Sequence, residues 1–468
     1  SSPQPSTQPS PPSSPPSSPQ PSTQPSPQPL PQVDPGPPRV YEAGHLAPSN
    51  GWPVWLKDYE QSKRTIHTSA VAFLGRDGAG RACFFLADDV GELHFCRVTQ
   101  AGDTGRVALS LQRVGLDRSF VQALYENEKW DFEALALDHY GHRSAAIPDT
   151  IYAFLSVEGH GPDYVEQTRI LRIRFARESS GGTDAARHPD RAAEKVSAPS
   201  RAADAAPAPD HAAEEVPAPA RDRAAEEVPA PAPSRTAEAA SGSPADARPD
   251  GLAEDDRDPV DERWRVSYVG EAIPGSRFWR GSVKSNRGFK GLATGERYLL
   301  LGLEGLDERG SFNVHGSVLF TYDRLTNDVM TLPTLGWGVR TIGGLAALSD
   351  SVSLLLDRDR ARINVLRWDI ENPGWIYSVH QFTLDLPAPG GFRYAIPALE
   401  GVTVDDVGDI WAVADPWHGH YRAMGAAPES VHVYLAAEIP ILYRFPGESV
   451  WETLGLSGTW QGTRASDQ

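Results

Sequence analysis

Residues 288–305 read GFKGLATGERYLLLGLEG, and residues 398–416 read ALEGVTVDDVGDIWAVADP. Each stretch has a short first segment with small residues, then a polar turn, then a strongly apolar second segment that ends in an acidic residue. The segments that begin at His67, Asp131 and Thr341 follow the same pattern. A pattern that recurs five times in one chain indicates a repeat architecture.

Each repeat continues with further apolar segments, which complete a unit of four strands. The third segments are LHFCRV, ILRIRF, VLFTYD, INVLRWD and ILYRF. The fourth segments, present in most repeats, are VALSLQRV, WRVSYVG, VMTLPTL and YSVHQFTLD. Small residues on the first strand suit the crowded axis of a ring, so the repeats predict an all-β fold, a β-propeller of four-stranded antiparallel blades. We expect five blades, with six as the alternative, and we expect residues 39–62 either to close the ring or to cap one face.

Two segments lack the composition of a folded core. Residues 1–38 are almost entirely Ser, Pro, Gln and Thr, which predicts a disordered, extended tether. Residues 178–262 are rich in Ala, Pro, Glu, Asp and Arg and contain no aromatic residue, which predicts a disordered insert. The propeller is therefore expected in two parts, 39–177 and 263–468, with the insert between the third and fourth strands of the second blade.

Charge and apolar content limit the partners and the location. The chain has a net charge of -18, and the insert with its 20 acidic and 9 basic residues supplies about -11 of it. No basic stripe remains, so a nucleic-acid partner is not expected, and no apolar run of 18 residues predicts a transmembrane span. A chain that begins with a Ser/Pro/Gln-rich tether is typical of an extracytoplasmic protein, whether periplasmic, secreted, or anchored to lipid or cell wall. We expect a monomer.

The two cysteines, Cys83 and Cys96, flank the segment FFLADDVGELHF. If the turn centres on Asp89 and Val90, the two cysteines face each other across a hairpin. A cross-strand disulfide would then form in an oxidising compartment. The alternative is a pair of buried thiols.

Alignment of the repeats brings charged residues to one end of the propeller, because the loop before the first strand and the loop after the second strand share a face. The aligned position of the first strand holds Ser69, Glu133, Lys290, Gly343 and Glu400. The acidic residues at the ends of the second strands are Asp88, Glu158, Glu304, Asp357 and Asp415. The basic residues shortly before the first strands are Arg64, Lys129, Arg287, Arg340 and Arg393.

This arrangement predicts a polar site at the channel mouth. The candidate catalytic residues are Glu133, Glu400 and Lys290, and the candidate ligands of a hard cation such as Ca²⁺ are Glu133, Glu400 and Asp415. The candidate residues for binding an anionic substrate are Arg287, Arg340, Arg393, Asp131 and His67. A cation beside such bases could polarise a phosphoester. The structural alternative is that the acids cap turns by accepting backbone N–H groups and that the bases pair with them.

Two other groups of side chains admit a functional and a structural interpretation. His160, His418 and His420 could bind a transition metal, although surface histidines without a metal are more common. Trp279, Trp337 and Trp417 could stack on sugars, although packing between blades is the commoner role. No nucleophile motif, metalloprotease motif or phosphate-binding loop is present.

The segments EALALD, GFKGLATGERYLLLGLEG and ALEGVTVDDVGDIWAVAD resemble bacterial propellers whose inner strands read E-G-[LV]-[AT], including the group named for an esterase-like activity of phytase. The run from Gly288 to Asp369 is also similar to an uncharacterised bacterial propeller family. The resemblance implies an exported protein and calcium-assisted phosphoester hydrolysis. Glu133 and Glu400 match the glutamate of the motif, whereas Lys290 and Gly343 replace it.

The sequence leaves two classes of function open. The first is a surface-exposed or secreted module that binds a small anionic ligand or a surface protein. The alternative is a metal-dependent hydrolase, either a Ca²⁺-assisted phosphoesterase or a lactonase-like enzyme acting at the channel mouth.

Overall fold

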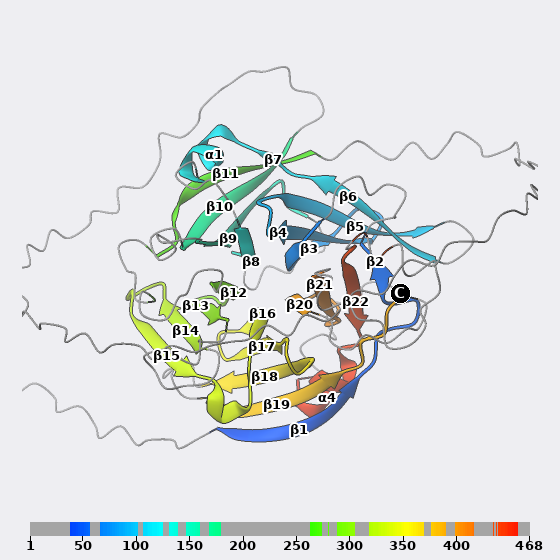
Figure 1. The fold of residues 1–468 in the computed structure, drawn as a ribbon, viewed down its shortest axis with the longest axis vertical. Helices are drawn as coiled ribbons and strands as arrows, with labels where there is room; N and C mark the ends of the chain where they lie inside the picture. Colours follow the sequence, from blue (N-terminus) through cyan, green and yellow to red (C-terminus); the bar gives the residue numbers. More distant parts are fainter. Residues whose placement is uncertain are drawn as a thin grey trace, which may run out of the picture. The chain divides into compact units, whose positions relative to one another are not determined.

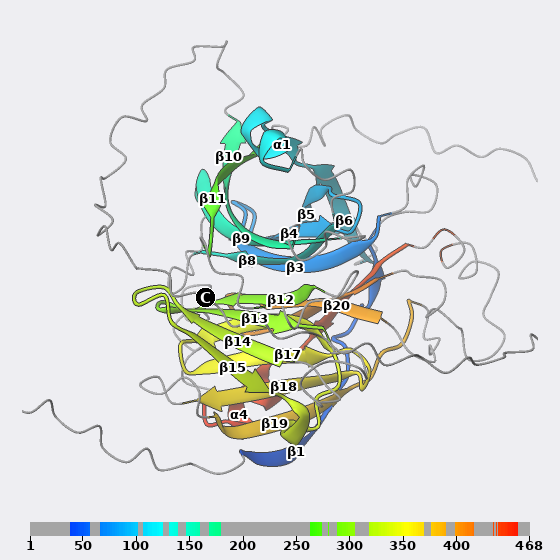
Figure 2. The same ribbon diagram turned by 60° about the vertical axis from the view of Figure 1, so that its left-hand side comes forward.

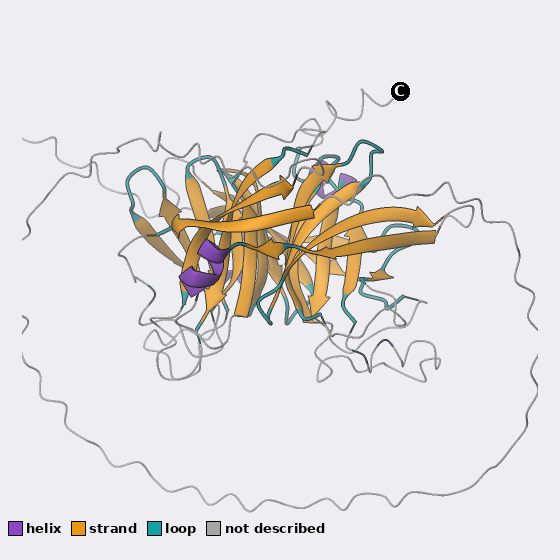
Figure 3. Cartoon of the chain, turned by 90° about the horizontal axis from the view of Figure 1, so that it is seen from above, coloured by secondary structure: helices purple, strands orange, loops and turns teal. Residues whose placement is uncertain are grey.

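The computed structural model describes residues 38–56, 66–101, 106–124, 131–138, 147–159, 168–178, 263–273, 279, 288–304, 318–368, 376–389, 398–415, 434, 437 and 439–456. The predicted tether 1–38 and the predicted insert 178–262 lie outside the described residues, except for Pro38 and Glu178. Most of the described residues belong to β-strands, as Figure 3 shows.

The described residues form five blades around one axis, which confirms the five-bladed propeller (Figure 1). Blade one consists of β3 (Thr68–Arg76), β4 (Ala82–Asp88), β5 (Leu93–Ala101) and β6 (Arg106–Arg113). Blade two consists of β8 (Asp131–Leu137), β9 (Thr150–Glu158), β10 (Arg169–Glu178) and β11 (Arg263–Glu271), with the short β7 (Gly115–Leu116) at its edge. Blade three consists of β12 (Phe289–Thr294), β13 (Tyr298–Leu303), β14 (Val318–Asp323) and β15 (Val329–Pro333).

The last two blades each contain a strand from the beginning of the described chain. Blade four consists of β16 (Ile342–Ser349), β17 (Val352–Asp357), β18 (Arg362–Trp368) and β19 (Ile376–Leu384), with β1 (Arg39–Leu46) at its outer edge (Figure 2). Blade five consists of β20 (Ala398–Val404), β21 (Ile410–Asp415), β22 (Ile441–Phe445) and β2 (Val54–Trp55). The helical elements that lie wholly within the described residues are α1 (Arg118–Leu124), η4 (Leu335–Trp337) and α4 (Glu448–Thr453).

The ring closes by pairing the first described segment with the last blade. Val54 and Trp55 pair antiparallel with Leu442 and Ile441, so β2 supplies the fourth strand of blade five. The inner strands also contact one another in the closed order β3, β8, β12, β16, β20 and back to β3. Of the two roles expected for residues 39–62, the structure therefore shows ring closure.

Small residues on the inner strands let neighbouring blades approach closely. A Cβ atom on Gly344 would lie 3.0 Å from the backbone nitrogen of Val402, and one on Gly401 would lie 2.8 Å from that of Val71. Both distances are shorter than Cβ contacts normally allow. The small-residue pattern that predicted the propeller thus has a steric cause at the axis.

Aromatic side chains fill the spaces between blades. Phe85 of blade one stacks on Phe175 of blade two with ring centroids 4.0 Å apart, and Phe84 contacts Trp411 of blade five at 4.8 Å. Trp279 and Trp337 are also buried, which favours their packing role over sugar stacking, and Trp417 lies outside the described residues. Such contacts bury large apolar areas and supply most of the favourable free energy of folding.

The two cysteines do not face each other. Cys83 pairs with Arg97, and Phe84 pairs with Cys96, so the hairpin register differs by one residue from the one that the predicted disulfide requires. A shift of one residue places the two side chains on opposite faces of the sheet. Both cysteines are buried and form no disulfide, so of the two alternatives that the sequence left open the pair of buried thiols holds.

Candidate functional site at the channel mouth

All five inner strands carry a β-bulge at the same position. The register shifts between Thr68 and Ala70, Phe132 and Ala134, Phe289 and Gly291, Ile342 and Gly344, and Leu399 and Gly401. The residues in the bulges are Ser69, Glu133, Lys290, Gly343 and Glu400, which are the five positions aligned from the sequence. Bulges re-aim side chains and are frequent beside functional sites, so this ring of residues is the natural base of a site.

The strand beside each inner strand adds a second ring, and here the register corrects the sequence alignment in two blades. The backbone N–H of Asp89 donates to the His67 carbonyl at 3.0 Å, and that of Arg358 donates to the Thr341 carbonyl at 3.1 Å. Asp89 and Arg358 therefore occupy the level that the sequence alignment gave to Asp88 and Asp357. The equivalent residues in the five blades are Asp89, Glu158, Glu304, Arg358 and Asp415.

Asp88 and Asp357 lie one residue earlier on their strands, opposite Thr68 and Ile342. An oxygen of Asp357 accepts the backbone N–H of Arg340 at 3.1 Å, which is the turn-capping role of the structural alternative. The charged side chains at the top of the described channel are Asp89, Asp131, Glu133, Glu158, Lys290, Glu304, Arg358 and Glu400, and we call this group the mouth cluster.

The first half of the mouth cluster contains three carboxyl groups and one ammonium group. Oxygen atoms of Asp131, Glu133 and Glu158 lie within 4.8 Å of one another, and all three residues are buried. The Nζ atom of Lys290 forms an ion pair with Glu133. Lys290 and Glu133 come from neighbouring blades, so the bulges of two inner strands assemble this group.

The proximity and burial of these groups shift their proton affinities in opposite directions. Burial, together with the charge of the Glu133 carboxylate, raises the pKa of Asp131 to about 9 and that of Glu158 to about 11. Burial also acts to raise the pKa of Glu133, but the Lys290 ammonium holds it below its usual range. At neutral pH the group therefore holds Glu133 as a carboxylate and Asp131 and Glu158 as neutral acids.

The second half of the cluster is organised by Arg358. Its Nη1 atom donates to Glu400, and its Nη2 atom donates to Glu304. A Cβ atom on Gly343 would lie 2.3 Å from the Leu399 carbonyl oxygen and 3.2 Å from the Arg358 Cβ atom. The missing side chain at Gly343 therefore leaves no open space, because the backbone of blade five and Arg358 occupy it.

Asp89 is the remaining acid of the cluster. Burial, together with the charges of Glu133 and Asp88, raises its pKa to about 7. Its Oδ1 atom is buried and has no hydrogen-bond partner among the described residues. A carboxyl group that titrates near neutral pH is suited to accept or release a proton.

The structure brings together only part of the predicted site. Glu133, Lys290, Glu400 and Asp131 lie in the mouth cluster, whereas His67 is half-buried beside it and contributes its carbonyl to the Asp89 turn. The remaining predicted residues lie as follows: the Arg340 side chain is exposed, Arg64, Lys129, Arg287, Arg393, His160, His418 and His420 lie outside the described residues, and only the backbone of Asp415 is described.

The ligand set proposed from sequence changes accordingly. Glu400 is engaged by Arg358, while Glu133 lies with Asp131 and Glu158. Asp89 and Arg358 were missed because the sequence alignment placed the acidic residue of each second strand at one level. The signal that could have found them is the pair of charges in ADD (87–89) and LDR (356–358), where a shift of one residue changes which side chain faces the axis.

Below the mouth, the described lining of the channel carries no charged side chain and includes Thr294 and Thr403. A cavity of about 100 Å³ is lined by the three residues that begin two positions after each bulge, such as Val71, Leu135 and Leu345. The mouth cluster therefore lies at one end of this cavity, and a charged ligand would find charged partners there rather than along the cavity wall.

Comparison with known proteins adds little to this geometry. No protein-family model matches the sequence, and no curated protein is similar to it. A solved structure of a luciferin-regenerating enzyme is similar over 81% of this chain and 78% of that chain, at 8% identity and a TM-score of 0.29. Among the described residues, no helix combines the length and apolar composition needed to cross a lipid bilayer.

Proposed function

We propose that the protein is a ligand-binding β-propeller whose channel mouth holds one hard divalent cation, Ca²⁺ in the first instance, on Asp131, Glu133 and Glu158. The observation that carries this proposal is the convergence of three buried carboxyl groups within 4.8 Å. Fully ionised, they carry three negative charges, and Lys290 contributes one positive charge. The remaining charge of -2 is what one divalent cation neutralises.

The raised pKa values of Asp131 and Glu158 support the same conclusion. Without a cation, the group reaches neutrality by keeping two protons, at pKa values raised by burial to about 9 and about 11. A divalent cation would replace these protons, because metal ligands bind in their deprotonated form. Strongly perturbed pKa values of several buried acids at one place are common at functional sites.

The donor atoms favour a hard cation and, through it, an anionic ligand. Three carboxyl groups offer oxygen atoms only, which suits Ca²⁺ better than a softer transition metal. The described mouth cluster has six acids and two bases, so by itself it offers no excess of positive charge to attract an anion. A bound cation with coordination positions left over would reverse this and hold a carboxylate or phosphate group of a small ligand.

The test is thermal unfolding and calorimetry of the full chain after EDTA treatment and desalting. Addition of Ca²⁺ should raise the midpoint temperature of the wild type, since a ligand that binds only the native state stabilises it. Calorimetry in buffers of different ionisation enthalpy should show proton release on binding. Glu158→Gln should lose most of both effects.

The matched control is Glu178→Gln. Glu178 also belongs to blade two, but its strand pairing places it at the end opposite Glu158, where it contacts Arg265. This variant should respond to Ca²⁺ as the wild type does. Absence of any response of the wild type to Ca²⁺, Mg²⁺ or Mn²⁺ would overturn the proposal.

A metal-dependent hydrolase is the second candidate, and Asp89 favours it. Burial and the Glu133 charge raise its pKa to about 7, so it could accept a proton from an attacking water molecule at neutral pH. The cation, when bound, would supply polarisation of the ester carbonyl or phosphoryl group. A screen of phosphoesters and lactones with Ca²⁺ should then find an activity that Asp89→Asn abolishes while its Ca²⁺-dependent stabilisation persists.

We further propose an extracytoplasmic location for this propeller. The Ser/Pro/Gln-rich composition of residues 1–38 supports it, as does a Ca²⁺ site, because extracellular modules use weak calcium sites where the ion is abundant. The free cysteines give it no support. Fractionation of cells that express the full-length protein tests it, and recovery in the cytoplasm alone would contradict it.

A further inference from the structure

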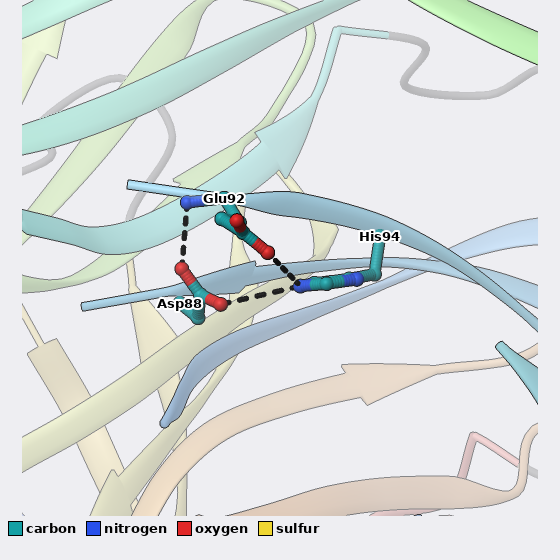
Figure 4. A group of neighbouring side chains, drawn as sticks. All are labelled: Asp88, Glu92 and His94. Atoms are coloured by element: carbon teal, nitrogen blue, oxygen red, sulfur yellow. Dashed lines mark hydrogen bonds and ion pairs between the residues drawn. The ribbon is translucent and has the colours of Figure 1, made fainter. Parts of the chain in front are cut away.

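A second cluster of side chains that could hold a metal ion lies at the turn between β4 and β5, and it shares no residue with the mouth cluster (Figure 4). Asp88 ends β4, Glu92 precedes β5, and His94 is the second residue of β5. The turn closes through Gly91, whose φ of +79° favours glycine, and the Asp88 N–H donates to the Glu92 carbonyl at 3.0 Å. Local geometry thus brings three potential ligands together.

The three side chains converge on one ring nitrogen. The Nε2 atom of His94 lies 3.2 Å from Asp88 Oδ2 and 3.7 Å from Glu92 Oε2, as the dashed lines in Figure 4 show. A ring nitrogen directs one hydrogen or one lone pair along one line, so it cannot satisfy two carboxylates equally well. Bonds of roughly 2.0–2.2 Å from a tetrahedral Zn²⁺ ion to nitrogen and oxygen place those ligand atoms roughly 3.3–3.5 Å apart. The observed distances from His94 Nε2 to the two carboxylate oxygens, 3.2 Å and 3.7 Å, lie just below and just above this range.

The surrounding contacts hold both carboxylates in place. The backbone N–H of Glu92 donates to Asp88 Oδ1 at 2.6 Å, which leaves Oδ2 turned toward His94. Arg113 Nη2 lies 2.9 Å from Glu92 Oε1, which turns Oε2 in the same direction. Partners that fix the second oxygen of a ligating carboxylate are typical of metal centres.

Two of the three side chains are buried and the third is partly exposed, as expected for a metal site that solvent reaches from one side. The side chains of Asp88 and His94 are 2% and 7% exposed, whereas that of Glu92 is 19% exposed. A buried carboxylate is expensive unless it is neutralised, and a cation would do so here. The ion would reach the site past Glu92, and that side would supply its remaining coordination position.

We infer that Asp88, Glu92 and His94 form a second metal site, for a divalent transition-metal ion of the Zn²⁺ class. The imidazole nitrogen distinguishes it from the mouth cluster, whose carboxyl groups offer oxygen only. Imidazole with carboxylate favours Zn²⁺ and Co²⁺ over Ca²⁺. The inference does not depend on the function proposed for the mouth.

The experiment uses the full-length protein after removal of metal with EDTA and desalting. Co²⁺ is added while visible absorption is recorded, and Zn²⁺ is then added as competitor and in a separate calorimetric titration. The wild type should bind one equivalent of Zn²⁺ that His94→Gln lacks. Glu92→Gln, which removes a ligand at the exposed edge of the site, should weaken binding of this Zn²⁺ equivalent by at least the roughly 10–100-fold that loss of an outer-shell partner costs.

Two control variants test whether the bound equivalent of Zn²⁺ belongs to this site. The double variant with His418→Gln and His420→Gln should keep it, which separates this site from the H-x-H segment. Glu158→Gln should keep it as well, which separates it from the mouth cluster. If His94→Gln does not fold, the Zn²⁺ affinity of Glu92→Gln alone tests the inference. Unchanged Zn²⁺ stoichiometry and affinity in Glu92→Gln and in folded His94→Gln would overturn the inference.

Discussion

The ammonium group of Lys290 on β12 lies against the buried carboxylate of Glu133 on β8, so the bulges of two neighbouring blades are joined by one ion pair. Both groups are withdrawn from water, the Glu133 side chain being only 2% exposed. In such a pair each charge depends on the other, because removal of one partner leaves the other buried and uncompensated.

Lys290→Met should therefore lower the free energy of unfolding by about 3–5 kcal/mol at pH 7, measured by urea denaturation. The double variant Lys290→Met, Glu133→Gln should regain much of this loss, because no unpaired charge remains. Arg265→Met is the control: its partner Glu178 is 38% exposed, so the effect should stay below about 1 kcal/mol. An equally small effect of Lys290→Met would show that the ion pair is not buried in solution.

Stability of the metal-free protein should fall as the pH rises above about 4. Burial and the Glu133 charge raise the pKa of Asp131 from 3.8 to about 9 and that of Glu158 from 4.5 to about 11. Between these values the native state holds protons that the unfolded state has released. Each extra proton lowers the free energy of unfolding by up to about 1.4 kcal/mol per pH unit over that window.

Urea denaturation in EDTA between pH 5 and pH 9 measures this slope. Glu158→Gln should flatten it, since the amide cannot titrate, whereas Glu178→Gln should leave it unchanged. If the proposed Ca²⁺ site exists, saturating Ca²⁺ should also flatten the profile. A wild-type stability that rises over this range would contradict the burial of neutral acids at the mouth.

Gly343→Ala should destabilise the propeller by about 1–3 kcal/mol, the usual effect of overfilling a packed site. Its Cβ atom would lie 2.3 Å from the Leu399 carbonyl, and a backbone atom cannot move aside as a flexible side chain can. Gly78→Ala is the matched control, because a Cβ atom there meets nothing within 4 Å. Equal midpoint temperatures of the two variants would argue against the close approach of blades four and five.

Cys83 and Cys96 should remain thiols even under oxidising conditions. Both are buried, and burial raises the pKa of Cys96 to about 12, so reaction of the native protein with Ellman's reagent should be slow. Unfolding in guanidinium without reductant should release both thiols. Fewer than two reactive thiols in the unfolded, unreduced protein would indicate a disulfide and a different hairpin register.

Much of the candidate site was predictable because each blade repeats the same local pattern. Alignment of the repeats identified Ser69, Glu133, Lys290, Gly343 and Glu400, and these are the residues in the five bulges. Asp89 and Arg358 were not predictable in this way. Their strands end in adjacent polar residues, and only the pairing with the inner strand decides which one lies at the level of the mouth cluster.

The register of the β4–β5 hairpin was likewise not predictable from the sequence. A turn centred between Asp89 and Val90 would have opposed Cys83 and Cys96, but the bond from Asp88 N–H to the Glu92 carbonyl closes a turn that is one residue longer. That single residue separates the cysteines and brings Asp88, Glu92 and His94 together.

The sequence by itself determined the class of fold and the aligned position on each inner strand, and it favoured five blades over six, because alternating apolar segments and small inner-strand residues are local properties that repeat. Tertiary structure alone decided the hairpin registers and the contacts between blades, such as that of Lys290 with Glu133. The physical reason is that a strand presents alternate residues to opposite faces, so a register shift of one residue exchanges the two faces. Where a strand is buried on both faces, as β4 is, its apolar sequence fits either register and does not choose between them.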